Sequence, residues 1–381
     1  MRAKSLLLGL ALGIAGCGLP GVGEESDSEA ETESQARSAV QAAGCVPEQH
    51  IDQHALCICD DLSGVGRVTT RRSVHGESSI AANGAIFLVS ETTIEGSVLA
   101  YRGFDSVSDA LIEGDLSSAF DVSSVGELEV GGNLQAGGDL SSVGGLTISG
   151  TAGVAGEVSV VGDQSIASWG SYDTQAAPCA CSGDNYFDVA TAVADAALNN
   201  NNVEVGLDTE GARTAGTTEL SLPSGRYYIK ATELVGNTTI TAAGQVALFV
   251  DGSLDLVGDS QLTIAEGGSL DLYVAGDVSS VGALSAGAPD KPFRLLVGGN
   301  ESVLLAVGEQ TFYGEIYAPS AAIELVGDTL VVGALFAKSL DGVGELTLEN
   351  GGLFSTPPST CLPPEDQAEP PVAELPQPTP H

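Results

Sequence analysis

The stretch SSVGELEVGGNLQAGGDLSSVGGLTISG, residues 123–150, decides the fold because it repeats itself after eighteen residues. The tetrapeptide that begins at Ser123 returns at Ser141, and equivalent aliphatic residues follow both copies. A further Val-Gly pair extends the same spacing to Val161. A fixed interval of this length is typical of solenoids, in which each lap of the chain stacks on the one before.

The Val-Gly pair also recurs along most of the remaining chain. It is found at Val65, Val125, Val143, Val161, Val235, Val257, Val281, Val307, Val326 and Val343, with successive intervals mostly between seventeen and twenty-four residues. Aliphatic and polar residues alternate between these pairs, as they do around Asp255 in GSLDLVG. Alternation with a period of two predicts short strands that turn one face inward.

We therefore predict a parallel β-helix with three strands in each coil and glycine at the corners, where positive φ is tolerated. About twelve coils over residues 62–350 would give a rod about 60 Å long at about 4.8 Å per coil. In this prediction Val125 stacks over Val143 inside a narrow tube, while Gly126 and Gly144 bend the chain. A β-sandwich is the alternative, but its hairpins do not require identical corners at this spacing.

The first residues, MRAKSLLLGLALGIAGC, combine a basic start with a short apolar run, as secretion signals do. Their end resembles the lipobox of bacterial lipoproteins, which implies cleavage before Cys17 and acylation of that cysteine. The alternative is an ordinary signal peptide with an incidental cysteine. We expect an exported, lipid-anchored protein at the outer membrane or cell surface.

Composition divides the chain into a signal peptide, two β-helical sections and their flanking segments. Residues 18–44 are acidic and polar, so they cannot bury enough surface to offset their ordering entropy. The last segment contains nine of the sixteen prolines, which favour extended chain. The predicted boundaries are a signal peptide (1–16), an acidic disordered tether (17–44), an N-terminal β-helical section (45–181), an insert with one helix (182–205), a C-terminal β-helical domain (206–354) and a Pro-rich tail (355–381).

Six cysteines remain if Cys17 carries lipid, and an even number in an exported chain predicts disulfides. They are Cys45, Cys57, Cys59, Cys179, Cys181 and Cys361. The sequence leaves fifteen pairings open, and we expect bridges between the segments near residues 57 and 180. The two Cys-x-Cys units also fit a tetrahedral zinc site, which is the less favoured alternative in an oxidising compartment.

The charge of the chain limits its partners. Thirteen basic and 51 acidic residues give a net charge of −38, which repels nucleic acid. Only 5% of the residues are aromatic, so the core must consist mainly of aliphatic side chains. We expect the membrane, through the lipid anchor, to be one partner, and glycans or envelope proteins to be others. End-to-end self-association is a further expectation.

The C-terminal section resembles a known domain. The segment FYGEIYAPSAAIELVGDTLVVGALFAKSL, residues 312–340, carries most of the likeness, which extends over about 216–352. It is similar to the β-helical domain of unknown function in PilX-type pilus-assembly proteins and bacterial surface proteins, and more loosely to the polymer-forming bactofilins. The resemblance implies a right-handed parallel β-helix and no established catalytic residues. Relatives tend to close with a His-Tyr-Asp-like motif, where this chain has Thr347-Leu348-Glu349-Asn350.

The sequence offers little support for catalysis, a metal or a cofactor, and we expect none of the three. None of the four histidines, His50, His54, His75 and His381, has a nucleophile-like setting. His50 and His54 could share a helical face and bind a metal, but an exposed polar segment is favoured. The strand aspartates Asp251, Asp255, Asp259, Asp271 and Asp277 could hold calcium, although a solvated outer face is favoured.

A carbohydrate-active enzyme remains the alternative of another class. Its basic candidates are Arg226, Arg294 and the group Arg67, Arg71 and Arg72, and no sequence pattern pairs them with acids. We expect instead a non-catalytic surface protein whose rigid acidic rod serves as a structural spacer, an adhesin or an envelope component. A bactofilin-like polymer is the third reading.

Overall fold

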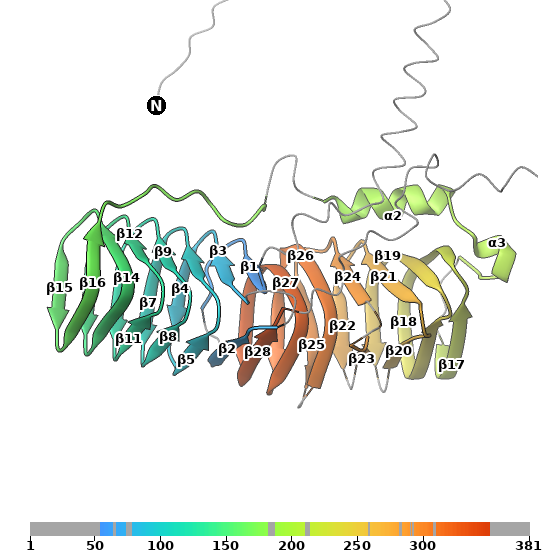
Figure 1. Cartoon of the computed structure of the whole chain (residues 1–381). Helices are drawn as coiled ribbons and strands as arrows, with labels where there is room; N and C mark the ends of the chain where they lie inside the picture. The colour runs from blue at the N-terminus through green and yellow to red at the C-terminus, as the bar shows by residue number, and fades with distance from the viewer. Residues whose placement is uncertain are drawn as a thin grey trace, which may run out of the picture.

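The computed structural model describes residues 54–350, apart from 64–65, 74–77, 182–186, 210–213, 258–259, 282–283, 290, 292 and 308–309. These residues form a parallel β-solenoid, seen from the side in Figure 1. The predicted fold class is therefore confirmed. The signal peptide, the tether, the tail and the cysteines at 17, 45 and 361 lie outside the described residues.

The N-terminal section has short strands, three to each coil in its regular part. They are β1 (Leu56–Ile58), β2 (Arg67–Arg71), β3 (Ile80–Ala82), β4 (Ala85–Leu88), β5 (Thr92–Ile94), β6 (Val98–Ala100), β7 (Gly103–Val107), β8 (Ala110–Ile112), β9 (Leu116–Ser118), β10 (Val122–Val125), β11 (Leu128–Val130), β12 (Leu134–Ala136), β13 (Leu140–Val143), β14 (Leu146–Val154), β15 (Val158–Val161) and β16 (Gln164–Gly170).

The C-terminal section has longer strands that bend around corners. They are β17 (Thr214–Leu222), β18 (Gly225–Ala242), β19 (Gln245–Val257), β20 (Ser260–Ile264), β21 (Ser269–Val274), β22 (Val278–Val281), β23 (Leu284–Ala286), β24 (Phe293–Val297), β25 (Ser302–Val307), β26 (Gln310–Val326), β27 (Thr329–Val343) and β28 (Glu345–Glu349).

The repeated tetrapeptide marks the same corner on successive coils. Strands β10 and β13 pair in parallel with Val125 opposite Val143. The glycines that follow, Gly126 and Gly144, have φ of +124° and +137°, a region that favours glycine. The eighteen-residue lap and its glycine corner are therefore confirmed.

The direction of the repeated valines was predicted wrongly. Val125 and Val143 are each 50% exposed and point outward, whereas Ser124 is buried. Side chains alternate along a strand, so the second serine of the motif takes the inward position and the valine after it faces solvent. The interior of this coil is formed by Val122 and Leu128 together with their neighbours on other strands.

The two sections form one rod in which the order of the coils differs from the order of the sequence. The C-terminal section starts at one end with β17 and reaches the middle at β28 (Figure 1). The N-terminal section starts in the middle, where Leu56 of β1 pairs with Leu335 of β27 on one side and with Ile80 of β3 on the other. It then continues in the same direction to β16 at the far end, so the winding is uniform.

One inward column of side chains runs through the whole rod and crosses this junction. Twelve successive strand pairings connect its members. In order they are Trp169, Ala152, Leu134, Leu116, Val98, Ile80, Leu56, Leu335, Ile316, Leu295, Leu272, Leu248 and Tyr227. All except Trp169 are at most 3% exposed. At about 4.8 Å per step, the column is about 58 Å long.

The chain returns from the end of the first section to the start of the second along the outside of the rod. We call this path, residues 171–181 and 187–209, the return segment (Figure 1). It contains two helices, α2 (Val189–Leu198) and α3 (Asn202–Val205), where one was predicted. Three asparagines, residues 199–201, separate them, because asparagine favours caps and turns over helix interiors. No helix of the described residues is long and apolar enough to cross a membrane.

Candidate functional site: the face covered by the return segment

One outer face of the rod is apolar and covered, which distinguishes it from the other outer faces. In β21 and β24 nearly every side chain is buried, on both sides of the sheet. Continuous apolar strands are typical of sheets packed on both faces. The outward members form a second column, which contains Tyr228, Phe249, Tyr273, Leu296, Tyr317, Phe336, Cys57 and Ala81.

Helix α2 packs its apolar side onto this column. Its first turn is capped by Asp188, whose carboxylate accepts from the backbone N–H of Thr191 at 3.0 Å. Phe187 lies beside Tyr273 and Tyr317, with ring centroids 6.1 and 6.4 Å apart. The buried residues of the helix that complete the contact are Val189, Ala192, Val193 and Ala196. This contact encloses a second, smaller hydrophobic core outside the solenoid.

Two disulfides fasten the return segment near the middle of the rod. Cys57 pairs with Cys179, and Cys59 pairs with Cys181. The expected link between the segments near residues 57 and 180 is therefore present. The zinc alternative for these four cysteines is wrong, because each sulfur is bonded to another sulfur. Asn83 adds two hydrogen bonds to the backbone N–H and carbonyl of Cys179, at 2.9 and 2.8 Å.

A buried ion pair lies in the neighbouring outward column. The Arg294 guanidinium donates to both carboxylate oxygens of Asp271, at 2.7 and 2.9 Å, and Glu315 is the next member of the column. All three are at most 6% exposed. Burial alone would lower the pKa of Arg294, but the Asp271 carboxylate raises it above its ordinary value. Burial also raises the pKa of the Tyr273 phenol beside them.

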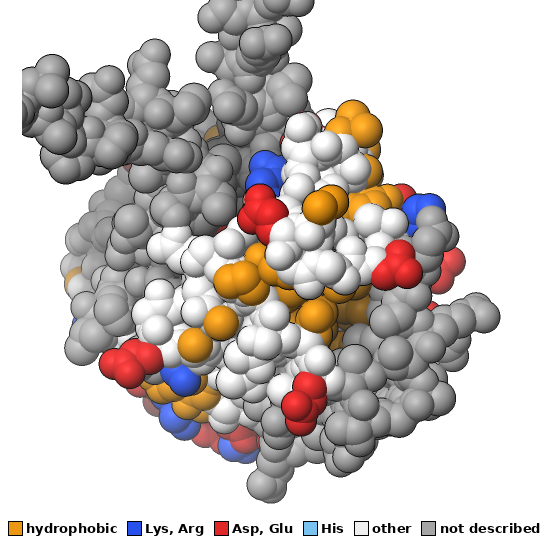
Figure 2. All heavy atoms as spheres, turned by 90° about the vertical axis from the view of Figure 1, so that its right-hand side faces the viewer, with side chains coloured by type: hydrophobic (Ala, Val, Ile, Leu, Met, Phe, Trp, Pro, Cys, Tyr) orange, Lys and Arg blue, Asp and Glu red, His pale blue; other side chains and the backbone are white. Residues whose placement is uncertain are grey.

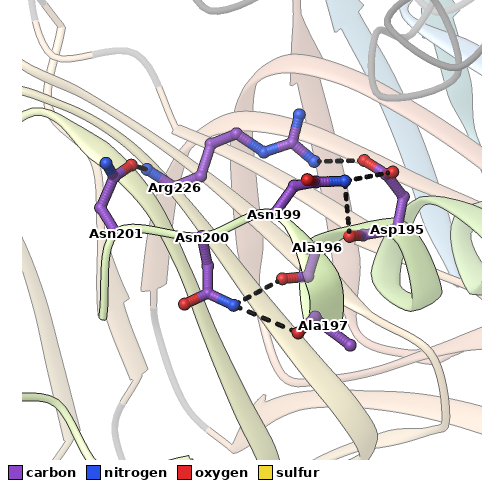
Figure 3. A network of polar contacts seen from close by, with 7 residues as sticks. All are labelled: Asp195, Ala196, Ala197, Asn199, Asn200, Asn201 and Arg226. Atoms are coloured by element: carbon purple, nitrogen blue, oxygen red, sulfur yellow. Dashed lines mark hydrogen bonds and ion pairs between the residues drawn. The ribbon is translucent and has the colours of Figure 1, made fainter. Parts of the chain in front are cut away.

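A second ion pair joins α2 to the end of the rod. The Arg226 guanidinium donates to Asp195 at 3.1 Å and lies 4.9 Å from the ring centroid of Phe249. Asn199 also donates to Asp195, at 2.9 Å. Figure 3 shows this network, in which Asn201 accepts from the backbone N–H of Arg226 at 2.9 Å. Two of the basic candidates, Arg226 and Arg294, thus pair with acids that no sequence pattern connects to them.

Many of the recurring acidic residues have a structural role that was not predicted from the sequence. At the corners, an Asp or Asn side chain accepts a hydrogen bond from the backbone N–H one coil further on. Asp115 accepts from Asn133 at 2.6 Å, and Asn133 accepts from Thr151 at 2.9 Å. Asp121 accepts in the same way from Asp139, at 2.8 Å. These side chains satisfy backbone donors that the corners leave without strand partners.

The aspartates considered for calcium do not converge. Asp271 is in the buried ion pair, Asp251 accepts from the Tyr228 hydroxyl at 2.7 Å, and Asp277 accepts from the backbone of Glu301 at 3.0 Å. Asp255 is exposed, and residue 259 lies outside the described residues. Within the described part of the chain, no group of three or more His, Cys, Asp or Glu side chains could hold a metal ion.

The remaining basic candidates are exposed. Arg67 is 3.8 Å from Glu345, and Arg72 is 3.8 Å from Glu113. Such surface pairs contribute little to stability because water screens them. Of the four histidines only His54 is described, and its burial lowers its pKa.

The covered face holds the return segment on the rod, and its buried charges, Arg294 and Asp271, pair with each other. The apolar pattern of the strands could have located this covered face from the sequence. The strand segments VALFV, LDLYV and FRLLV of the C-terminal section are almost continuously apolar, whereas strands β9 to β13 of the N-terminal section alternate apolar and polar residues. That difference predicts a cover over the second section, and the amphipathic segment at 187–198 was available to provide it. The covered column also extends to Cys57 and Ala81 of the first section.

Comparison with known proteins gives a domain match over part of the chain. No characterised protein and no solved structure shows significant similarity to it. Residues 164–350 match a domain of unknown function, DUF7305. The match covers β16, the return segment and the C-terminal section up to β28. The chain thus contains a DUF7305 domain, which forms one part of a longer β-solenoid.

Proposed function

We propose that the chain is a non-catalytic, lipid-anchored protein of the cell envelope or cell surface, and that its rigid acidic rod has a structural or adhesive function. Continuous parallel ladders support rigidity, because bending the rod would break hydrogen bonds between coils. The ion pair between Arg226 and Asp195 and the two disulfides hold the return segment against it. The resemblance of residues 216–352 to a domain of pilus-assembly and surface proteins supports the location.

One observation carries the more specific form of this proposal. The first and last described residues both lie at the middle of the rod. The carbonyl of Ala55 accepts from the backbone N–H of Leu335 at 3.0 Å, and the backbone N–H of Asn350 donates to the Ser78 hydroxyl at 3.0 Å. A tether that starts at Cys17 would therefore join the rod at the middle of its length. The rod would then act as a crossbar with two free ends and not as a spacer that stands on one end.

The anchor is tested by metabolic labelling with palmitate. The unchanged chain should incorporate label and fractionate with membranes, whereas Cys17→Ala should lose the label and still be exported. Label that persists in the variant would contradict the anchor. Surface proteolysis of intact cells then separates an outward-facing location from a periplasmic one.

The crossbar is tested by energy transfer to a membrane dye in proteoliposomes. A donor fluorophore is placed at Val161, near one end, or at Glu219, near the other, and both positions are exposed. A crossbar predicts similar transfer from the two positions. A strong difference would favour a rod that stands on one end. A separate assay tests whether the purified protein cleaves glycans. Cleavage that is abolished by substitution of a single carboxylate residue would contradict the proposal that the protein is not an enzyme.

A further inference from the structure

The end of the rod formed by β15 and β16 is not closed. We call residues 158–170 the terminal coil. Among the described residues, β15 pairs only with β13 and β16 pairs only with β14, so one edge of each strand has no strand partner. The return segment leaves along the side of the rod, where the backbone N–H of Asp173 donates to Gln135 at 3.0 Å. Unpaired strand edges are templates for pairing with another chain.

The apolar interior also reaches solvent at this end. Trp169 continues the column of Ala152, yet it is 55% exposed where Ala152 is fully buried. Val158 continues the column of Leu140 and is 41% exposed where Leu140 is fully buried. Inward side chains of the terminal coil therefore form an apolar face across the end of the tube. Exposed apolar faces of this kind mark interaction surfaces.

Part of the opposite end carries a built cap, although β17 at that end pairs only with β18 among the described strands. The side chain of Asn202 accepts from the backbone N–H of Tyr228 at 3.0 Å and donates to its carbonyl at 2.6 Å. The Asn201 side chain accepts from the backbone N–H of Arg226 at 2.9 Å, while the backbone N–H of Asn201 donates to the Arg226 carbonyl at 2.7 Å. The carbonyl of Thr209 accepts from the backbone N–H of Lys230 at 3.0 Å. These contacts continue the ladder along one stretch of β18. Figure 2 looks onto this end, where apolar side chains lie near the centre and charged ones toward the rim.

We propose that the terminal coil binds the terminal coil of a second copy of this chain, in a two-fold contact between equal surfaces. A head-to-tail contact would have to accommodate or displace the cap of Asn201, Asn202 and Thr209, whereas an end-to-end pair of terminal coils meets no such cap. A contact of equal surfaces closes on itself and yields a dimer, while a head-to-tail contact would yield a filament. The proposal does not depend on the lipid anchor or on the crossbar.

The chain's own flanking segments are poorer candidates for this face. Residues 18–44 are acidic, and residues 103–181, which form this half of the rod, contain no Lys or Arg that could attract them. Residues 355–381 contain nine prolines, which cannot donate to a strand edge.

The size and charge of the face predict how the dimer should behave. A three-sided coil with sides of about 20 Å along the backbone, or about 30 Å with side chains included, gives an end face of about 400 Å² per partner, the size of a weak, transient interface. We therefore expect micromolar affinity. The charged residues near the rim, Glu157 and Asp163, are acidic, so two copies repel each other. Salt screens such repulsion, so affinity should increase with ionic strength.

The protein contains a natural probe of this surface, because Trp169 is its single tryptophan. The full chain with Cys17→Ala, which prevents acylation, is studied by sedimentation velocity and tryptophan emission between about 1 and 200 μM. We expect a monomer–dimer equilibrium with a blue shift of the emission as the dimer forms. The dissociation constant should fall several-fold between 0.05 and 0.5 M NaCl.

Matched variants distinguish this contact from nonspecific association through other exposed apolar residues. Val158→Asp keeps the probe and should weaken the dimer at least tenfold, and Trp169→Lys should do the same by sedimentation. Leu198→Lys is the control, since Leu198 is an exposed apolar residue on α2, 85% exposed and away from the terminal coil. Circular dichroism shows whether each variant is folded. A folded monomer at all concentrations, or filaments in place of dimers, would overturn the proposal.

Discussion

The corner glycine at residue 144 provides the sharpest test of the coil geometry. Gly144 has φ of +137°, and a Cβ added there would lie 2.2 Å from the carbonyl oxygen of Gly126 on the neighbouring coil. Backbone strain of this kind costs about 1–3 kcal/mol, and the clash with a fixed backbone atom adds to it. The loss of glycine's freedom in the unfolded chain offsets about 0.4–1 kcal/mol. Gly144→Ala should therefore destabilise the protein by about 2–4 kcal/mol.

The next residue is a matched control. A Cβ at Gly145 would meet the flexible side chain of Glu127 at 3.3 Å, and its φ is not in the positive region. Gly145→Ala should change stability by less than about 1 kcal/mol. Two coils before Gly144 the corner position is occupied by Ser108, a residue with a side chain, with φ of +149°. Ser108→Gly should be neutral or stabilising by about 1 kcal/mol, because glycine adopts this conformation without strain.

The assay is thermal unfolding followed by circular dichroism, with urea unfolding as a second measure. At about 2–4 °C per kcal/mol for a chain section of this size, Gly144→Ala should lower the Tm by about 4–16 °C. Gly145→Ala should lower it by no more than a few degrees. Equal effects of the two substitutions would refute the corner geometry. A large loss of stability in Ser108→Gly would refute it as well.

Three further predictions concern the buried ion pair, the return segment and the junction. Arg294→Met should cost about 3–5 kcal/mol because it leaves Asp271 charged and buried, and adding Asp271→Leu should recover part of that loss in urea unfolding. Asp188→Ala should cost about 1 kcal/mol through the lost cap of α2, seen as faster amide hydrogen exchange in that helix while the solenoid strands are unchanged. Burial lowers the pKa of His54 in the folded state, so its contribution to stability is present above its ordinary pKa of 6.5 and is lost as the pH falls below that value. His54→Gln should therefore reduce the fall in Tm between pH 7 and pH 5, and an unchanged slope would contradict this assignment.

The regular part of the fold could be predicted from the sequence because it depends on local spacing. The return of SSVG after eighteen residues identified the lap, the corner and the pairing of Val125 with Val143. The prediction that these valines face inward was wrong, because it relied on their apolar character alone. Side chains alternate along a strand, so the direction of each valine depends on whether an odd or an even number of residues separates it from a buried position. Val122 and Leu128, which lie on either side of the corner, show the correct parity.

The order of the coils could not be predicted, because it depends on contacts with no sequence signature. Leu56 meets Leu335 across 279 residues, and nothing in either strand specifies the other beyond an inward aliphatic side chain. The ion pair between Arg294 and Asp271 could not be predicted from the sequence either. Arg294 and Asp271 are 23 residues apart, which is one coil of the C-terminal section, but the coil length there varies. The corner hydrogen bonds, by contrast, repeat every eighteen residues and could have been inferred.

The distance between the two ends of the rod tests the central claim most directly, which is that the two sections are stacked into one solenoid through β1 and β27. Spin labels introduced as non-natural amino acids at residues 161 and 219 are measured by pulsed electron paramagnetic resonance, with excess unlabelled chain to suppress contacts between copies. One rod of twelve or more coil steps predicts a narrow distribution near 60 Å, at about 4.8 Å per step. A distance below about 40 Å would mean that the sections lie side by side, and it would contradict the stacked junction.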